Sequence, residues 1–177
     1  MRRADLVAEC ARCAGLCCVA TSFEASQEFA IDKPLGVACP HLSHEARCAI
    51  HADRARRGFA GCTLYDCYGA GPRVTRMYEE APRSDARRDA VFLAMRELHE
   101  LLWLLSEAAK LCPASRADLR AALSDRVDML EATAGGSIAE LLALDLEAQQ
   151  RATRALLRRV GEALGGRAAL RALPIVK

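Results

Sequence analysis

Eight of the nine cysteines in this 177-residue chain lie close together near its amino end, and thiols at this density point to metal chemistry. The eight are Cys10, Cys13, Cys17, Cys18, Cys39, Cys48, Cys62 and Cys67. The Cys10-x2-Cys13 pair has the common chelating spacing, because two intervening residues let both sulfurs reach one ion. Thiolates are soft ligands that select zinc or iron–sulfur chemistry over magnesium or calcium. We therefore predict that all eight clustered cysteines are metal ligands.

The identity of the metal is left open by the spacing of the cysteines. Four thiolates close a structural zinc site or hold one [4Fe–4S] cluster, and eight permit two zinc ions or one cluster with one zinc. Neighbouring side chains in extended backbone point opposite ways, so Cys17 and Cys18 are not expected to serve one mononuclear ion. Two sites, a cluster with a spare thiol, or a buried Cys18 would each explain the pair. We predict a [4Fe–4S] cluster or another iron centre, with zinc as the alternative.

The amino-terminal residues and the lengths of the apolar runs predict the cellular location. Residues 1–9 contain two arginines but no apolar core of a signal peptide, and no apolar run approaches the ~18 residues of a membrane span. A cytoplasmic protein without membrane association is expected. In a reducing compartment, clustered cysteines favour metal binding over a disulfide framework, which is the alternative.

Four histidines accompany the cysteines. His41, His44 and His51 lie in or beside the cysteine loops, and each is either a nitrogen ligand or an ordinary surface histidine. His99 lies in a helical segment, where a surface or core position is expected. Cys112 stands alone before a proline, and we expect it to be a buried cysteine at a helix end.

Charge and composition limit the partners. The formal net charge is +2, so the small basic cluster of Arg54, Arg56 and Arg57 is expected to offset thiolate charge, and nucleic acid is not the expected partner. The expected partner is an unknown protein or peptide. Broad apolar faces on the carboxyl-terminal helices permit a homodimer.

The chain changes character near Pro82, which predicts two domains, a cysteine-rich metal-binding module over 1–80 and an α-helical bundle over 81–177. The first is expected to be irregular, with glycine-containing loops and a short strand near 29–31. The second shows helical periodicity over 84–111, 115–132 and 137–164, with a short helical tail over 167–173. On the first of these helices apolar residues recur at spacings of three and four, which predicts a mostly buried helix with this core stripe: Val91, Met95, Leu98, Leu102 and Leu105, widened by Phe92, Leu101 and Trp103. Capping signals begin these helices at Ser84, Ser115 and Ser137. The predicted fold is mainly α, an irregular module packed on a three-helix antiparallel bundle.

The order of the cysteines resembles the zinc- or iron-chelating cysteine-cluster family named for its CxxCxxCC opening. Its landmarks here are Cys10-x2-Cys13-x3-Cys17-Cys18, Cys39-Pro-His-Leu42, Arg47-Cys48-Ala-Ile-His51 and Cys62-x4-Cys67. The opening is one residue longer than the family's name, and His51 stands where the family usually has tyrosine. Some members of the broader group resemble flagellin lysine methylases, in which an iron–sulfur cluster accompanies a methyl transfer.

A longer resemblance is to the segment preceding the repeats in some actinobacterial pentapeptide-repeat proteins. The matching residues are Phe29-Ala-Ile-Asp-Lys-Pro34, Arg57-Gly-Phe-Ala-Gly-Cys62, Tyr65-Asp-Cys-Tyr-Gly-Ala-Gly71 and Met95-Arg-Glu-Leu-His-Glu-Leu-Leu-Trp103. This chain lacks the repeats themselves. The resemblance implies that the cysteine module and the helices form one unit.

Three functions fit these observations. The first is a metal-binding protein with a redox, sensing or scaffold role. The second is an iron-dependent or iron–sulfur enzyme that modifies a peptide or small metabolite, since a catalytic metal keeps one position open. The third is a zinc-bound interaction module. The sequence has no phosphate-binding glycine loop, no Ser-His-Asp order and no HExxH metal-hydrolase motif.

Overall fold

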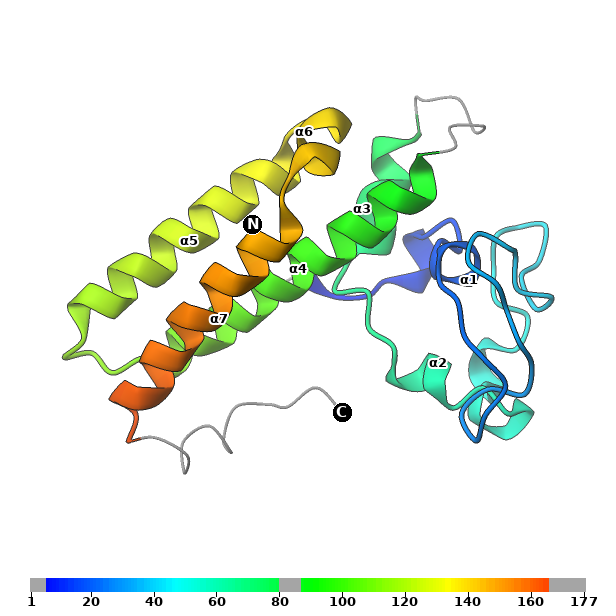
Figure 1. The fold of residues 1–177 in the computed structure, drawn as a ribbon. Coiled ribbons are helices and arrows are strands. Elements are labelled where there is room, and N and C mark those ends of the chain that lie inside the picture. Colours follow the sequence, from blue (N-terminus) through cyan, green and yellow to red (C-terminus); the bar gives the residue numbers. More distant parts are fainter. Residues whose placement is uncertain (1–5, 80–86, 166–177) are drawn as a thin grey trace. The chain divides into compact units, whose positions relative to one another are not determined.

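The computed structural model describes residues 6–79 and 87–165, and it is mainly α-helical, as the sequence predicts (Figure 1). The β pairing among these residues consists of two isolated antiparallel bridges, Phe23 with Lys33 and Leu42 with Cys48. The short strand predicted near 29–31 is therefore wrong. The described chain forms two compact units, one up to Arg96 and one from Glu97. The domain boundary predicted at 80/81 lies outside the described residues.

The first unit carries the eight clustered cysteines on short helical turns joined by irregular loops. Its α-helices are α1 (Cys17–Ala20), α2 (Gly61–Leu64) and α3 (Ala70–Met77), and its 3-10 turns span Cys10–Arg12, His51–Asp53 and Ala55–Arg57. Leu16, Phe59 and Val74 are among its buried side chains. The irregular module predicted from the glycines is thus present, with more helix than expected.

Helix α3 forms where the sequence predicts glycine-containing loops. Gly69 precedes it with φ 77°, a left-handed conformation that glycine adopts without steric cost. Pro72 stands in its first turn, where a backbone N–H has no intrahelical partner in any case. The Gly-Ala-Gly-Pro run 69–72 therefore starts a helix instead of prolonging a loop.

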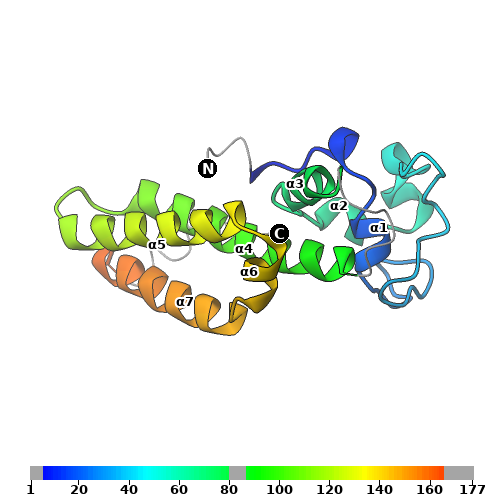
Figure 2. The same ribbon diagram turned by 90° about the horizontal axis from the view of Figure 1, so that it is seen from above.

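The second unit is built from antiparallel helices. Helix α4 (Arg88–Leu111) begins in the first unit and ends in the second, and α5 (Ala117–Gly135), α6 (Ile138–Ala143) and α7 (Leu146–Ala163) follow. Figures 1 and 2 show α5 and α7 beside the second half of α4, with alternating chain direction. Short connections of this kind place consecutive helices antiparallel.

The core stripe predicted on the long helix is confirmed. All of its predicted positions are buried: Val91, Met95, Leu98, Leu102 and Leu105. Their spacing of three and four residues puts them on one face, and burial of that face stabilises a helix more than propensity does. Phe92 and Leu101 are also buried and widen the stripe as expected, whereas Trp103, expected to do the same, is only half-buried.

Helix boundaries confirm some predicted caps and correct others. The Ser137–Glu140 capping box is present, with the Ser137 hydroxyl accepting from the Glu140 amide at 3.2 Å. The predicted box at Ser115 is wrong, because α5 starts after Arg116, whose guanidinium binds the Asp118 carboxylate. The predicted cap at Ser84 and the helical tail over 167–173 lie outside the described residues.

The single helix predicted over 137–164 is two helices. Leu144 is extended between α6 and α7, and the Asp145 carboxylate accepts from the amide of Ala148 at 2.9 Å. An aspartate in this position caps a new helix by satisfying an orphan amide. Among the described helices, none is long and apolar enough to cross a membrane.

Candidate metal centre

All nine cysteines are thiols in the structure, and none is in a disulfide. Cys10 is exposed, the other seven clustered cysteines are half-buried, and Cys112 is buried. Partial burial on irregular loops restrains the sulfurs while leaving them accessible from outside. The predicted burial of Cys112 at a helix end is confirmed.

The thiols do not converge on a preformed ion cage. Among the described residues, no three or more His, Cys, Asp or Glu side chains lie close enough together to hold a metal ion. Ligation by all eight cysteines therefore stays a prediction. The structure brings the thiols together in smaller sets, and each set is held by its own backbone contacts.

One set is the pair Cys13 and Cys67, which meets at helix α3. A Cβ on Gly71 would lie 2.7 Å from the Cys13 sulfur and 3.7 Å from the Cys67 sulfur, so both sulfurs lie beside this glycine. Burial raises the pKa of Cys67, while backbone amides of Gly71 and Gly69 act in the opposite direction. The amide of Ala14 also donates to the Thr75 hydroxyl at 2.9 Å, which fastens the Cys10–Cys13 loop to α3.

The vicinal pair Cys17 and Cys18 differs from the sequence expectation. Both residues belong to α1 and not to extended backbone, so their side chains project roughly 100° apart and not in opposite directions. A hydrogen bond between the two thiols lowers the pKa of Cys17 to about 7 and raises the pKa of Cys18. The argument from extended backbone against a shared ion therefore does not apply to this pair.

Backbone contacts also hold Cys39 and Cys48, the first of them against Cys18. The amide of Cys39 donates to the carbonyl of Cys18 at 2.8 Å. Cys48 forms the isolated bridge with Leu42, three residues after Cys39. Gly15 turns the chain before α1, with φ 69° and too little space for a Cβ beside Leu42.

Three cations surround the thiol-bearing loops. Arg47 donates to the carbonyls of Cys10 at 2.7 Å, Ala11 at 2.7 Å and Cys13 at 3.0 Å. Arg54 donates to the carbonyl of Cys62 at 3.0 Å. Its charge lowers the pKa of the Cys62 thiol, but burial has the larger effect and raises it. Arg54 thus offsets thiolate charge, as predicted.

The third cation is Lys33, which is buried. Its amine donates to the carbonyls of Val19 at 2.9 Å, Thr21 and Pro34 at 3.3 Å. Burial lowers the pKa of Lys33. A buried ammonium is costly unless its donors are satisfied, and the three carbonyls accept from it here.

The histidines differ in their surroundings. His51 and His44 are exposed, while the His41 ring packs edge-on against Phe59 with centroids 5.0 Å apart. His99 is fully buried, so of the two expected positions, surface or core, it takes the core one. Ligation by His41, His44 or His51 stays a prediction.

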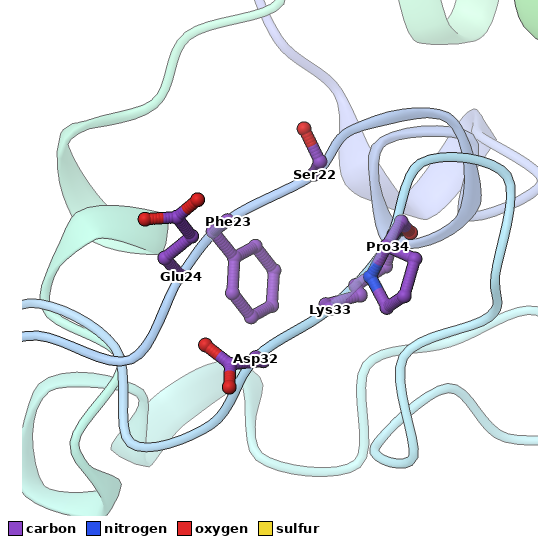
Figure 3. A pocket seen from close by; sticks show the side chains of 6 residues that line it. All are labelled: Ser22, Phe23, Glu24, Asp32, Lys33 and Pro34. Carbon is purple, nitrogen blue, oxygen red and sulfur yellow. Dashed lines mark hydrogen bonds between the residues drawn. The ribbon is translucent and has the colours of Figure 1, made fainter.

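A surface hollow of about 440 Å³ lies in the first unit, and no cysteine is among its lining residues (Figure 3). Its lining residues are Ser22, Phe23, Glu24, Asp32, Lys33 and Pro34. Figure 3 shows the carboxylates of Glu24 and Asp32 near the ring of Phe23. The Asp32 carboxylate accepts from the amide of Ala25 at 2.7 Å, so it shapes the loop.

Comparison with known proteins adds one relative. The chain is similar to the uncharacterized protein YybG of Bacillus subtilis strain 168, with 41% identity over 110 residues. The match covers 59% of this chain and 39% of YybG, so the chain spans about two fifths of that relative's length. No protein family model matches the chain. No solved structure matches it.

Sequence reasoning missed three residues that shape the candidate site: Lys33, Arg47 and Gly71. Arg47 and Lys33 lie in the motifs that carry the two resemblances, but the sequence predicts no role for either, because an isolated cation carries no signal of what it binds. The Gly69-Ala-Gly71-Pro72 run did carry a signal, since two glycines before a proline indicate a helix start where another group approaches the backbone.

Proposed function

We propose that this chain is a metal-binding protein of the cysteine-cluster type, holding an iron–sulfur or other iron centre, or zinc, in a redox, sensing or scaffold role. The observation that carries the proposal is the gathering of eight free thiols in one compact unit. Thiols so concentrated need either disulfides or metal, and the first is absent from the structure. The resemblance to the cysteine-cluster family and to the segment of pentapeptide-repeat proteins supports the same proposal.

The residues present fit a soft metal in donor chemistry. Gly71 leaves room beside two sulfurs, and its amide and that of Gly69 favour the charged form of Cys67, as amides do for metal-bound sulfur. Bound iron–sulfur would supply reversible electron transfer, and zinc would supply folding free energy. The ligands would come from the eight clustered cysteines, drawn closer together by side-chain rotation.

The chain's own residues supply the rest of the centre's environment. Arg47, Arg54 and Lys33 hold loop carbonyls and place positive charge around the thiolates. A centre of four thiolates is anionic, and nearby cations stabilise it and raise the reduction potential of an iron–sulfur cluster. This arrangement supports the redox role, in which the charge on the centre changes.

The alternative is an iron-dependent or iron–sulfur enzyme that acts on a peptide or small metabolite. It is favoured by the exposure of Cys10 and His51, which leaves part of the cysteine-rich unit open to a substrate. For either function, we propose a cytoplasmic location, a protein or peptide partner and a homodimer. Neither nucleic acid nor a membrane is the proposed partner.

Metal analysis tests the proposal directly. We expect anaerobically purified full-length protein to contain iron with acid-labile sulfide, and to show broad visible absorption that bleaches with dithionite. Colourless protein with stoichiometric zinc would remove the redox role and the iron enzyme, and leave a scaffold role. Protein that holds neither metal after anaerobic purification, and takes up neither on reconstitution, would overturn the proposal. A ligand-accessible iron, seen as a spectral change with an added exogenous ligand, would favour the enzyme.

A further inference from the structure

The sulfurs of Cys13 and Cys67 come from opposite ends of the cysteine-rich stretch and meet beside one glycine. A Cβ at Gly71 would stand 2.7 Å from the Cys13 sulfur, well inside the ordinary contact distance of about 4 Å. Any side chain at this position would push the thiols away from α3. The close approach therefore depends on glycine, although the φ of Gly71 is not in the left-handed region.

The contact between these two segments is fixed by the backbone. The carbonyl of Cys67 accepts from the amide of Ala70 at 2.8 Å as α3 begins. The hydroxyl of Thr75, one turn later, accepts from the amide of Ala14, directly after Cys13. Two hydrogen bonds to the same helix thus position both cysteines before any metal binds. This preorganisation reduces the conformational entropy that the chain loses on metal binding.

Cys18 and Cys39 lie in a different backbone frame. The Cys39 amide donates to the Cys18 carbonyl at 2.8 Å, and Gly36 donates to the carbonyl of Val19 at 3.1 Å. These bonds join α1 to the 36–39 loop and involve no residue of α3. The Cys13 and Cys67 sulfurs beside Gly71 and the Cys18–Cys39 pair are thus held by separate sets of backbone contacts.

We infer that the chain binds two soft metal ions at separate centres, with Cys13 and Cys67 as ligands of one and Cys18 and Cys39 as ligands of the other. This inference rests on the proposed function and deepens it by stating which cysteines share an ion. Cys10 begins the turn that ends at Cys13 and is a candidate for a third ligand of the first centre. The first centre depends on Gly71, and the second does not.

Zinc titration of metal-free, full-length protein tests the grouping, with Zn²⁺ as the probe. Wild-type protein is expected to bind two ions per chain, and C13S, C67S and C39S one each. The double variant C13S/C67S should also bind one ion, because both changes disable the same centre. The double variant C13S/C39S should bind none. Two centres are indicated if the loss of bound ions is non-additive in C13S/C67S and additive in C13S/C39S.

Gly71→Ala tests the geometry without removing a thiol. We expect it to weaken zinc binding at the first centre at least tenfold and to leave the second unchanged. The matched control is Gly135→Ala in helix α5, where a Cβ would meet nothing within 4 Å. Both glycines are helical, and alanine favours helix, so the two variants differ mainly in what the new methyl group meets. Circular dichroism checks that both retain the wild-type helix content.

The outcomes separate the inference from the proposed function. If C13S/C67S loses both ions, if wild-type protein binds a single ion, or if Gly71→Ala binds like Gly135→Ala, the inference is overturned while metal binding stands. If wild-type protein binds no metal, the proposed function fails and the inference fails with it. Should Gly71→Ala misfold, the count of ions in the cysteine variants still decides the grouping.

Discussion

The amine of Lys33 donates a 2.9 Å hydrogen bond to the carbonyl of Val19 in helix α1, and the lysine is buried, with only 3% of its surface exposed. The same amine reaches the carbonyls of Thr21 and Pro34. Its three donors thus join the end of α1 to the segment that leads to Cys39. Lys33 also pairs with Phe23 through an isolated bridge, so backbone and side chain hold the same junction.

Lys33→Met is expected to loosen this junction. Methionine fills a similar volume but leaves carbonyls without a donor, at a cost of about 1–3 kcal/mol per buried group. Relief of the buried charge offsets part of that loss, so we expect a net destabilisation of about 2 kcal/mol, measured by urea unfolding. The control is Lys110→Met, whose amine forms an exposed pair with Glu107 and should change stability by less than about 0.5 kcal/mol. Equal effects of the two substitutions would contradict the role given to Lys33.

Arg47→Lys should free the first cysteine loop. A lysine amine cannot reproduce the planar fork that contacts the carbonyls of Cys10, Ala11 and Cys13. Hydrogen exchange at the amides of Arg12 and Cys13, which close this turn, should become about tenfold faster. Arg56→Lys is the control, because Arg56 is exposed and pairs only locally with Asp53. Unchanged exchange in Arg47→Lys would show that the turn holds without the guanidinium.

Cys112→Ser should retain the full metal content of the wild type. Cys112 is 4% exposed, belongs to the second unit and directly follows α4, so serine there costs roughly 1–3 kcal/mol of stability through burial of a hydroxyl. Cys48→Ser, by contrast, should yield metal-poor or insoluble protein. Metal per chain and the thermal midpoint of each variant check the two expectations. Substantial metal loss in Cys112→Ser would show that the eight clustered cysteines are not the complete ligand set.

Glu140→Gln should remove an acid-sensitive contribution to the stability of the second unit. The backbone amide of Ser137 donates to the Glu140 carboxylate at 2.7 Å and lowers the pKa of that carboxyl. A group whose folded pKa is depressed contributes stability above its unfolded pKa, about 4.3, and loses that contribution as pH falls through the folded pKa. The difference in thermal midpoint between wild type and variant should thus be largest near pH 6 and shrink below about pH 4. A difference that grows on acidification would contradict this assignment.

The sequence by itself determined the features that depend on near neighbours. The apolar stripe from Val91 to Leu105, the cap at Ser137 and the burial of Cys112 all follow from residues within one or two turns of helix. Helical periodicity is a local property, so it can be read without knowing the fold. The same local reasoning failed at Asp145, because a capping aspartate inside a periodic stretch looks like an ordinary polar position.

Tertiary structure alone decided which cysteines meet. Cys13 and Cys67 are brought together by the course of the loops and by the space at Gly71, and Lys33 reaches α1 by the same folding back of the chain. Spacing along the chain limits which thiols can chelate locally, but it does not fix how long loops close. Loop closure depends on backbone contacts such as Ala14 with Thr75, whose partners carry no distinctive sequence signal.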